Sequence, residues 1–463
     1  EIYMGDWSSD VCSSDLGPSE FECFVREETS WRARPEVAPD GRRVLYSSYQ
    51  GRQRHQLWLT TLAGDAQLPL TFGDFDATQA RWSPNGRRIA YISNEQAGGS
   101  LQLWLLETVG GARTLVNPRE RQSMRPMAQL RIDLRSAAGQ PVNGRVAVLG
   151  ADNRYYAPEL ARVHADDGFD PHRQPSELRY FHCWQECVVT APVGEVEVVA
   201  WRGQEHTPVW QRVQVKADAM NVVDATLREL KLPDWAPVAA TADLHVHNNY
   251  GGLYRNDDAA LRWQMEAEDL DVAYNLIVNK EQRIPDIDKV ADKIEKVANR
   301  PFFYSQEYHT SFWGHMGLLD LRRYLTPDFS AYQFSALSSP YPHNGVIADM
   351  THEQGGLVGY VHPFDTVPAP EREQITNALP ADVALGKVDY IEVVGFADHK
   401  ATAEVWYKLL NLGFRVPTGA GTDAMANYAS LRGPVGMNRV YLNTGGSAEP
   451  YMEIGRASCR ERV

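Results

Sequence analysis

Two histidines, His245 and His247, stand two residues apart in the segment TADLHVHNNYGGLY, which covers residues 241–254. In a β-strand, side chains two residues apart point to the same face of the sheet. Two imidazoles on one face, followed by a turn rich in asparagine and glycine, can supply half of the ligands of a metal ion. Asp243 is on the same face, where its carboxylate is expected to orient a ligand histidine. The spacing alone fits two structural histidines equally well.

Further residues with metal-binding or acid–base side chains close later apolar stretches. Glu307 and His309 end the segment FFYSQEYH, and His315 stands eight residues after Glu307. His362 ends GGLVGYVH, and Asp423 follows PTGAGT. Each residue alone has a structural explanation, such as packing or helix capping. Their recurrence at strand ends favours one shared metal site.

A particular order of elements is needed to bring these residues together. From residue 238 onward, apolar strands alternate with amphipathic helices. The expected strands are 243–247, 272–278, 302–309, 357–362, 390–394, 416–421 and 439–443. The expected helices are 258–268, 286–298, 344–354 and 402–411. Such alternation predicts a parallel sheet closed into a barrel, with the chemistry at the carboxyl ends of its strands.

The motifs of this region, taken in order, resemble those of the PHP superfamily of metal-dependent hydrolases. They are most similar to the CehA/McbA-type group, which is named for carbaryl hydrolases. The resemblance covers roughly residues 243–443 and includes DLHVHNNYGGLYRND, QEYHTSFWGHMGLLDL and LLNLGFRVPTGAGTDA. It implies a distorted (β/α)7 barrel at 238–452 that carries more than one metal ion.

The resemblance also implies roles for individual residues. It assigns metal-binding roles to His245, His247, Glu307, His315, His362 and Asp423. Glu307 would bridge two ions. The ligands of a third ion in PHP relatives are missing together, so two divalent ions are expected, either zinc or manganese or iron. Lys280 would supply positive charge in place of the third ion, or else it is a solvated loop lysine.

Two divalent ions can lower the pKa of a shared water, and the metal-activated hydroxide would attack an ester, carbamate or amide carbonyl. Asp423 would shuttle the proton, and Lys280 or His309 would stabilise the oxyanion. One alternative is a PHP-type phosphoesterase that uses the same ions. Another is a non-catalytic binding protein that uses a propeller. A serine peptidase is disfavoured because the sequence has no Gly-x-Ser-x-Gly motif.

The N-terminal part contains an internal repeat. Residues 38–51, APDGRRVLYSSYQG, return at 83–96 as SPNGRRIAYISNEQ. A turn, an alternating strand and a tryptophan-bearing strand in each copy are typical of propeller blades. The copies resemble TolB-like repeats, so residues 17–125 are expected to form about two blades, which could bind a protein or peptide. Residues 128–232 alternate apolar and polar residues between turns, which predicts an all-β sandwich.

The composition of the chain narrows the classes of partner that it is expected to bind. The formal net charge of −14 argues against nucleic acid and anionic membranes, and a small-molecule substrate is expected. No apolar run approaches the roughly 18 residues of a membrane span. Cys183 and Cys187 fall in an expected strand, where they would be about 13 Å apart. Buried thiols are therefore expected there, because this separation is too long for a disulfide.

Both ends of the chain match translated sequencing-library adapters, over residues 6–16 and 453–463. Residues 1–16 and 453–463 are therefore interpreted as adapter-derived tails. The expected fold is multidomain, with a partial β-propeller, a β-sandwich and an α/β barrel, truncated at both ends. By resemblance, the protein is expected to be exported to the periplasm or the cell exterior.

Overall fold

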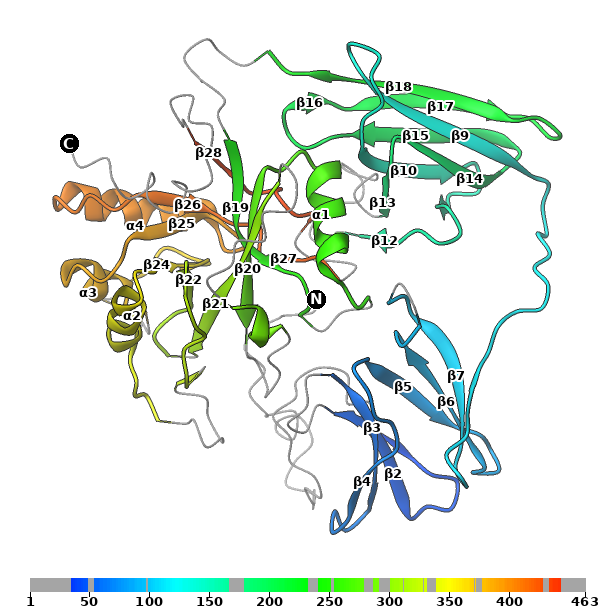
Figure 1. The fold of residues 1–463 in the computed structure, drawn as a ribbon, viewed down its shortest axis with the longest axis horizontal. Helices are drawn as coiled ribbons and strands as arrows, with labels where there is room; N and C mark the ends of the chain where they lie inside the picture. Colours follow the sequence, from blue (N-terminus) through cyan, green and yellow to red (C-terminus); the bar gives the residue numbers. More distant parts are fainter. Residues whose placement is uncertain are drawn as a thin grey trace.

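The structure is a computed structural model. It describes residues 35–48, 54–96, 99–165, 179–231, 240–250, 254–278, 286–290, 300–310, 312–327, 329–330, 339–369, 371, 377–427 and 433–442. Figure 1 shows two blade-like sheets in blue, a two-layered region in cyan and green, and a mixed sheet from green to red. Both predicted adapter-derived tails lie outside the described residues. Within these residues, no helix is long and apolar enough to cross a membrane.

The N-terminal region forms two four-stranded antiparallel sheets. The first contains β1 (Glu36–Val37), β2 (Arg43–Ser48), β3 (Gln56–Thr61) and β4 (Gln67–Pro69). The second contains β5 (Ala77–Trp82), β6 (Arg88–Ser93), β7 (Gln102–Glu107) and β8 (Arg113–Leu115). Their buried side chains share one core, which includes Leu45, Leu57, Ile89 and Trp104. Two consecutive four-stranded antiparallel sheets thus stand where the repeat predicts two blades.

The repeated turns have the same geometry. Gly41 and Gly86 have φ of 68° and 66°, which only glycine adopts without strain. Gly41 N donates to Ala38 O at 2.8 Å, and Gly86 N donates to Ser83 O at 2.9 Å. The sequence repeat is therefore a structural repeat, down to the hydrogen bonds of its turns.

The middle region consists of two β-sheets. One has the order β12 (Val163–His164), β13 (Tyr180–Cys183), β10 (Gly144–Gly150), β15 (Gly194–Trp201), β17 (Val209–Val215), with β11 (Tyr155–Tyr156) on β10. The other has the order β14 (Glu186–Pro192), β9 (Met127–Ser136), β18 (Asn221–Glu229), β16 (His206–Thr207). Apolar side chains of both sheets, such as Leu130 and Val146, share one core. We call this region the sandwich.

The prediction of free thiols in the sandwich is wrong. Cys183 and Cys187 form a disulfide, with their Cα atoms 5.7 Å apart. The segment is not one extended strand, because the chain turns at Gln185, whose φ is 62°. β13 ends at Cys183 and β14 begins at Glu186, in the other sheet. The disulfide therefore closes a corner between the two sheets.

The C-terminal region is built on one mixed sheet. Its order is β26 (Thr418–Ala420), β25 (Tyr390–Val394), β24 (Leu357–Tyr360), β22 (Met316–Leu319), β21 (Phe302–Thr310), β20 (Val272–Val278), β19 (Ala240–His247), β27 (Ala424–Met425). β23 (Phe329–Ser330) pairs with β21, and β28 (Val440–Leu442) pairs with β19. The edge strands β26 and β27 are joined by residues 421–423, so the two edges are at most about 14 Å apart there. The sheet therefore curls into a half-barrel.

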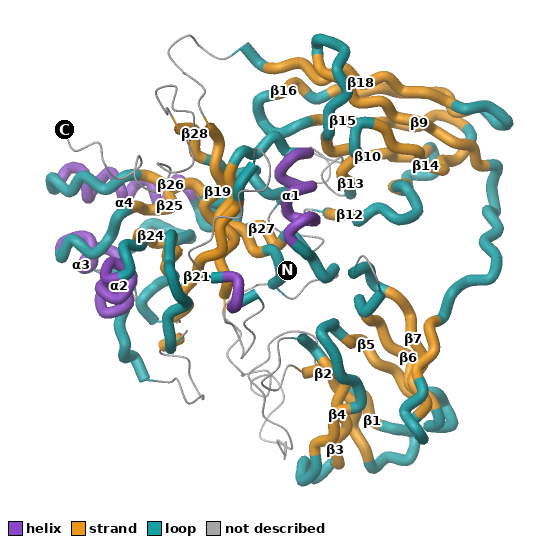
Figure 2. Tube along the Cα trace, in the orientation of Figure 1, coloured by secondary structure: helices purple, strands orange, loops and turns teal. Residues whose placement is uncertain are grey.

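The predicted distorted (β/α)7 barrel is not supported, because the region is rich in sheet and poor in helix. β22 runs antiparallel to both β21 and β24, which breaks the expected alternation. The described helices are α1 (Asp258–Ala267), α2 (Asn344–Glu353), α3 (Leu379–Ala384) and α4 (His399–Asn411). The helix expected at 286–298 is represented by a 3-10 turn, Ile287–Lys289, and residues 291–299 lie outside the described part. Figure 2 shows α2, α3 and α4 together at one end of the sheet.

Helix α1 lies between the mixed sheet and the sandwich, where it contacts β10 and β13 (Figure 1). Directly after it, the buried carboxylate of Glu268 meets His182 Nε2 at 2.8 Å and Arg145 Nε at 3.3 Å, both from the sandwich. Burial would raise the pKa of Glu268, but Arg145 and His182 outweigh burial and lower this pKa. The two regions are thus joined by a buried ionic contact.

Candidate metal centre

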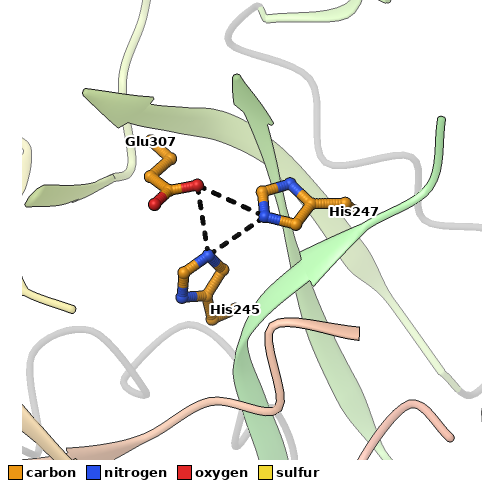
Figure 3. A group of neighbouring side chains, drawn as sticks. All are labelled: His245, His247 and Glu307. Carbon is orange, nitrogen blue, oxygen red and sulfur yellow. Dashed lines mark hydrogen bonds and ion pairs between the residues drawn. The ribbon is translucent and has the colours of Figure 1, made fainter. Parts of the chain in front are cut away.

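The last residues of β19 carry the two histidines into the interior of the half-barrel. His245 is fully buried, and His247 is 2% exposed. β19 is covered on both sides by parallel neighbours, β20 and β27, so its end is enclosed by other strand ends. Figure 3 shows both rings turned toward the carboxylate of Glu307, which comes from β21.

In both histidines the Nδ1 atom already has a hydrogen-bond partner. His247 Nδ1 lies 2.7 Å from the carbonyl oxygen of Leu276, which can only accept a hydrogen bond. His245 Nδ1 lies 3.0 Å from Oε2 of Glu392. With the proton on Nδ1, each neutral ring presents a lone pair at Nε2. Both histidines are thereby held in the form that binds metal through Nε2.

Four acceptor atoms converge at the inner side of the rings. His245 Nε2 and His247 Nε2 are 3.1 Å apart. Glu307 Oε2 lies 3.4 and 3.3 Å from these nitrogens, and Asp423 Oδ1 lies 3.5 and 2.9 Å from them. Ligands at 2.0–2.1 Å from a tetrahedral zinc ion are about 3.3–3.4 Å from one another. The spacing of this donor set therefore fits one ion.

A second group gathers at the other oxygen of the same carboxylate. Glu307 Oε1 lies 3.0 Å from His309 Nε2, 3.2 Å from His315 Nδ1 and 3.2 Å from His362 Nε2. Glu307 thus faces one cluster of donors with Oε2 and a second with Oε1. Asp423 likewise extends toward the second group, with Oδ2 3.7 Å from His362 Nε2.

Backbone conformation brings two of these side chains inward. Asp423 has φ of 55° and His362 has φ of 30°, values that are uncommon outside glycine. Asp423 N donates to the carbonyl oxygen of His245 at 2.7 Å, which fixes the turn between β26 and β27 to β19. Strained conformations of this kind persist where the surrounding structure fixes them, and they cluster at functional sites.

The role predicted for Asp243 is wrong. Its carboxylate does not orient a histidine ring but accepts backbone hydrogen bonds from His245 and Thr422 through Oδ1, at 3.0 and 2.9 Å. Oδ2 accepts a third, from Gly436 N at 2.7 Å. Burial raises the pKa of Asp243 to about 6. The residue therefore ties together the backbone segments that carry the candidate ligands.

The charges of the cluster are strongly coupled. Burial would lower the pKa of His245, but Asp423, Glu392 and Glu307 outweigh burial and raise the pKa well above its ordinary value. Burial would raise the pKa of Glu307, but His309 and His245 outweigh burial and lower the pKa well below its ordinary value. The buried carboxylates thus favour positive charge among the histidines, which protons or divalent ions could supply.

Seven of the eight sequence-predicted site residues lie together, namely the six candidate ligands and His309. The eighth, Lys280, lies outside the described residues. Among the other histidines, His343, just before α2, and His399, the first residue of α4, are exposed, and His352 pairs with Asp389 at 2.8 Å.

Glu392 was missed by the sequence reasoning. Its Oε2 contacts His245 Nδ1, and its Oε1 accepts from His362 N at 3.2 Å. A signal was present, because Glu392 is the only charged residue in the apolar strand YIEVV.

Comparison with known proteins gives limited matches. No family model matches the chain. Over 89 residues the chain is 36% identical to the uncharacterized peptidase YuxL of Bacillus subtilis (strain 168), which covers 18% of this chain and 13% of that protein. The chain thus spans a small part of this relative's length.

Solved structures with local similarity include two TolB proteins. The putative TolB of Agrobacterium tumefaciens is 20% identical, with a TM-score of 0.16, over 18% of this chain and 31% of that one. TolB of Acinetobacter baumannii is 16% identical, with a TM-score of 0.17, over 40% and 42%. PsfC of Pseudomonas syringae PB-5123 is 13% identical, with a TM-score of 0.28, over 46% and 93%. These values show neither a family nor an activity, and membership of the PHP superfamily stays a prediction.

Proposed function

We propose that this protein is a metal-dependent hydrolase with a two-metal centre in its C-terminal half-barrel. One observation carries the proposal: His245 and His247 face each other through Nε2 at 3.1 Å, while both Nδ1 atoms are held by acceptors. Two lone pairs directed at one another repel unless a proton or a cation lies between them. Two buried carboxylates beside them make a divalent cation the better fit.

The donor set supports a division into two sites. His245, His247 and Asp423 would hold one ion together with Glu307 Oε2. His315 and His362 would hold the other together with Glu307 Oε1. When bound, the ions would acidify a water molecule and polarise the substrate's scissile group. Imidazole and carboxylate donors suit zinc, and also manganese or iron.

Side chains of the protein would accept the proton of the water and stabilise the charge that develops on the substrate. Asp423, which like Glu307 faces both groups of donors, would accept the proton of the attacking water. His309 lies 3.0 Å from Glu307 and stacks on His315, with ring centroids 4.0 Å apart. Its ring would stabilise the oxyanion that develops on the substrate. Lys280 stays a candidate for the same role.

The substrate class is proposed to be a carboxylic ester, carbamate or amide. This rests on the CehA/McbA-type resemblance, and the peptidase name of the Bacillus subtilis relative agrees with hydrolysis of a carbonyl compound. The main alternative is a phosphoester, which the same ions would serve. Export is also proposed, since the Cys183–Cys187 disulfide fits an oxidising compartment.

Paired assays with an aryl ester, an aryl carbamate, an anilide and an aryl phosphate test the proposal, using protein loaded with zinc or manganese. We expect metal-dependent hydrolysis of a carbonyl substrate. The H247A substitution should reduce hydrolytic activity by more than the roughly 100-fold that is typical when an outer partner of a metal ligand is removed. H343A, at an exposed histidine, is the matched control. Equal activity of H247A and wild type would overturn the proposal, and hydrolysis of the phosphate alone would favour the phosphoesterase.

A further inference from the structure

A cavity of about 310 Å³ lies where the sandwich meets α1 and the start of β21. The sandwich lines it with Asn143, Gln185 and Arg202, and the C-terminal region lines it with Arg262, Glu266 and Arg300. None of these residues belongs to the candidate metal centre. The cavity is therefore a separate feature of the junction between the two regions.

Three of the four charged residues around the cavity are arginines. Arg202 Nη1 donates to the carbonyl oxygens of Asn143 and Glu266, at 2.8 and 2.7 Å, and thereby links the sandwich to α1. Asp269, which is not part of the cavity lining, forms ion pairs with Arg202 at 2.5 Å and with Arg300 at 2.6 Å. Glu266 Oε2 accepts a hydrogen bond from Asn143 Nδ2 at 3.1 Å. Asp271 Oδ1 also lies 3.4 Å from Arg300 Nη1, so Arg202 and Arg300 are ion-paired, whereas Arg262 is not.

The guanidinium of Arg262 forms no ion pair within the described residues, although it is close enough to Asp258 of α1 to help lower the pKa of that carboxyl. No carboxylate of the described residues lies within ion-pairing distance of it, and its Nε and Nη2 atoms are buried without a hydrogen-bond partner there. Its contact within the described chain is the face of the Phe302 ring, 5.2 Å from its Cζ atom. A partly buried cation without an ion pair or hydrogen bonds at two of its nitrogens is costly, so an anion in the adjoining cavity would stabilise it.

We propose that this cavity is a binding site for a small oxyanion, either a carboxylate or a phosphate group, with Arg262 as its principal contact. A guanidinium group offers paired N–H donors that match two oxygens of such an anion. Arg300 and Arg202 also line the cavity and would contribute N–H donors that their ion pairs leave available. Arg262 itself lines the cavity, and its buried Nε and Nη2 atoms have no hydrogen-bond partner within the described residues. The bound anion braces the sandwich against α1.

Isothermal titration with sodium phosphate and with sodium succinate, each against sodium chloride at equal ionic strength, tests this proposal and tells the two anion classes apart. We expect wild type to bind at least one of them, and R262Q to bind it roughly 10- to 100-fold more weakly. R212Q, which alters an exposed arginine of the sandwich paired with Glu197, should bind like wild type. R262K keeps the charge without the paired donors and should be intermediate.

Two results would overturn the proposal. Equal binding by wild type and R262Q would mean that the anions bind elsewhere, including at the metal centre. An absence of binding beyond the chloride control would mean that the cavity takes no such ligand. Thermal unfolding of each variant shows whether it is folded. In chloride buffer R262Q should unfold at the same temperature as wild type or above it, since it loses a charge that forms no ion pair within the described residues, and phosphate or succinate should raise the wild-type value alone.

Discussion

Replacing Glu392 with glutamine would disturb the outer support of two candidate ligands. Glu392 accepts one hydrogen bond from His245 Nδ1 at 3.0 Å and another from the backbone N of His362 at 3.2 Å. A carboxylate can accept at both oxygens, whereas an amide has one oxygen and one NH2 group. In E392Q one of the two donors therefore loses its acceptor. If the amide NH2 group faces His245, the ring can keep this contact only by moving its proton to Nε2, where the metal would bind; if the amide oxygen faces His245, His362 N loses its acceptor.

The lost contact is a hydrogen bond to a charged group, worth about 1.5–3 kcal/mol. That free energy corresponds to roughly 10- to 100-fold weaker metal binding, the range found for other outer partners of metal ligands. Zinc titration against a competing chelator measures this affinity. The matched control is E197Q, at a carboxylate of the sandwich that pairs with Arg212. If E392Q bound zinc as tightly as wild type, the contact at Nδ1 would have no part in metal binding, and the reasoning would be refuted.

Three further predictions concern the support of the site and of the fold. G421A puts a Cβ atom 2.3 Å from Cβ of His245, so it should cost about 1–3 kcal/mol of stability and weaken zinc binding; unchanged binding would contradict this. The disulfide between Cys183 and Cys187 spans four residues, so reduction should lower the free energy of unfolding by about 2 kcal/mol, and a C183S/C187S variant should not respond to reductant. Glu268 has a lowered pKa, so the stability from its ionised form is present above pH 4.5 and lost as the pH falls through its folded pKa. Urea unfolding of wild type and E268Q should therefore converge in acid, and a constant difference would argue against the ionic contact.

The strands that were predicted best are those buried on both faces. The segments 272–278 and 390–394 match β20 and β25 residue by residue. Strands enclosed by parallel neighbours read as continuous apolar runs, and turn residues mark their ends. The repeated turns of the blades were equally clear, because a glycine with positive φ recurs at the same place in each copy.

Other features depend on contacts that a single sequence does not encode. β22 is only four residues long, and nothing in MGLL specifies that it runs antiparallel to its neighbours. The disulfide was missed because Gln185 turns the chain between two apolar segments that read as one strand. The pairing of His245 with Glu392 joins residues 147 positions apart, and only the curled sheet brings them together.

The metal content of the purified protein is the most direct test of a two-metal centre. Elemental analysis after loading with zinc and removal of excess metal should find two ions per chain in wild type. H315A should retain one ion, because only the group at Glu307 Oε1 loses a ligand, and E307A should retain neither in stoichiometric amount. A wild-type chain without stoichiometric metal, or an E307A variant that keeps both ions, would contradict the proposed centre.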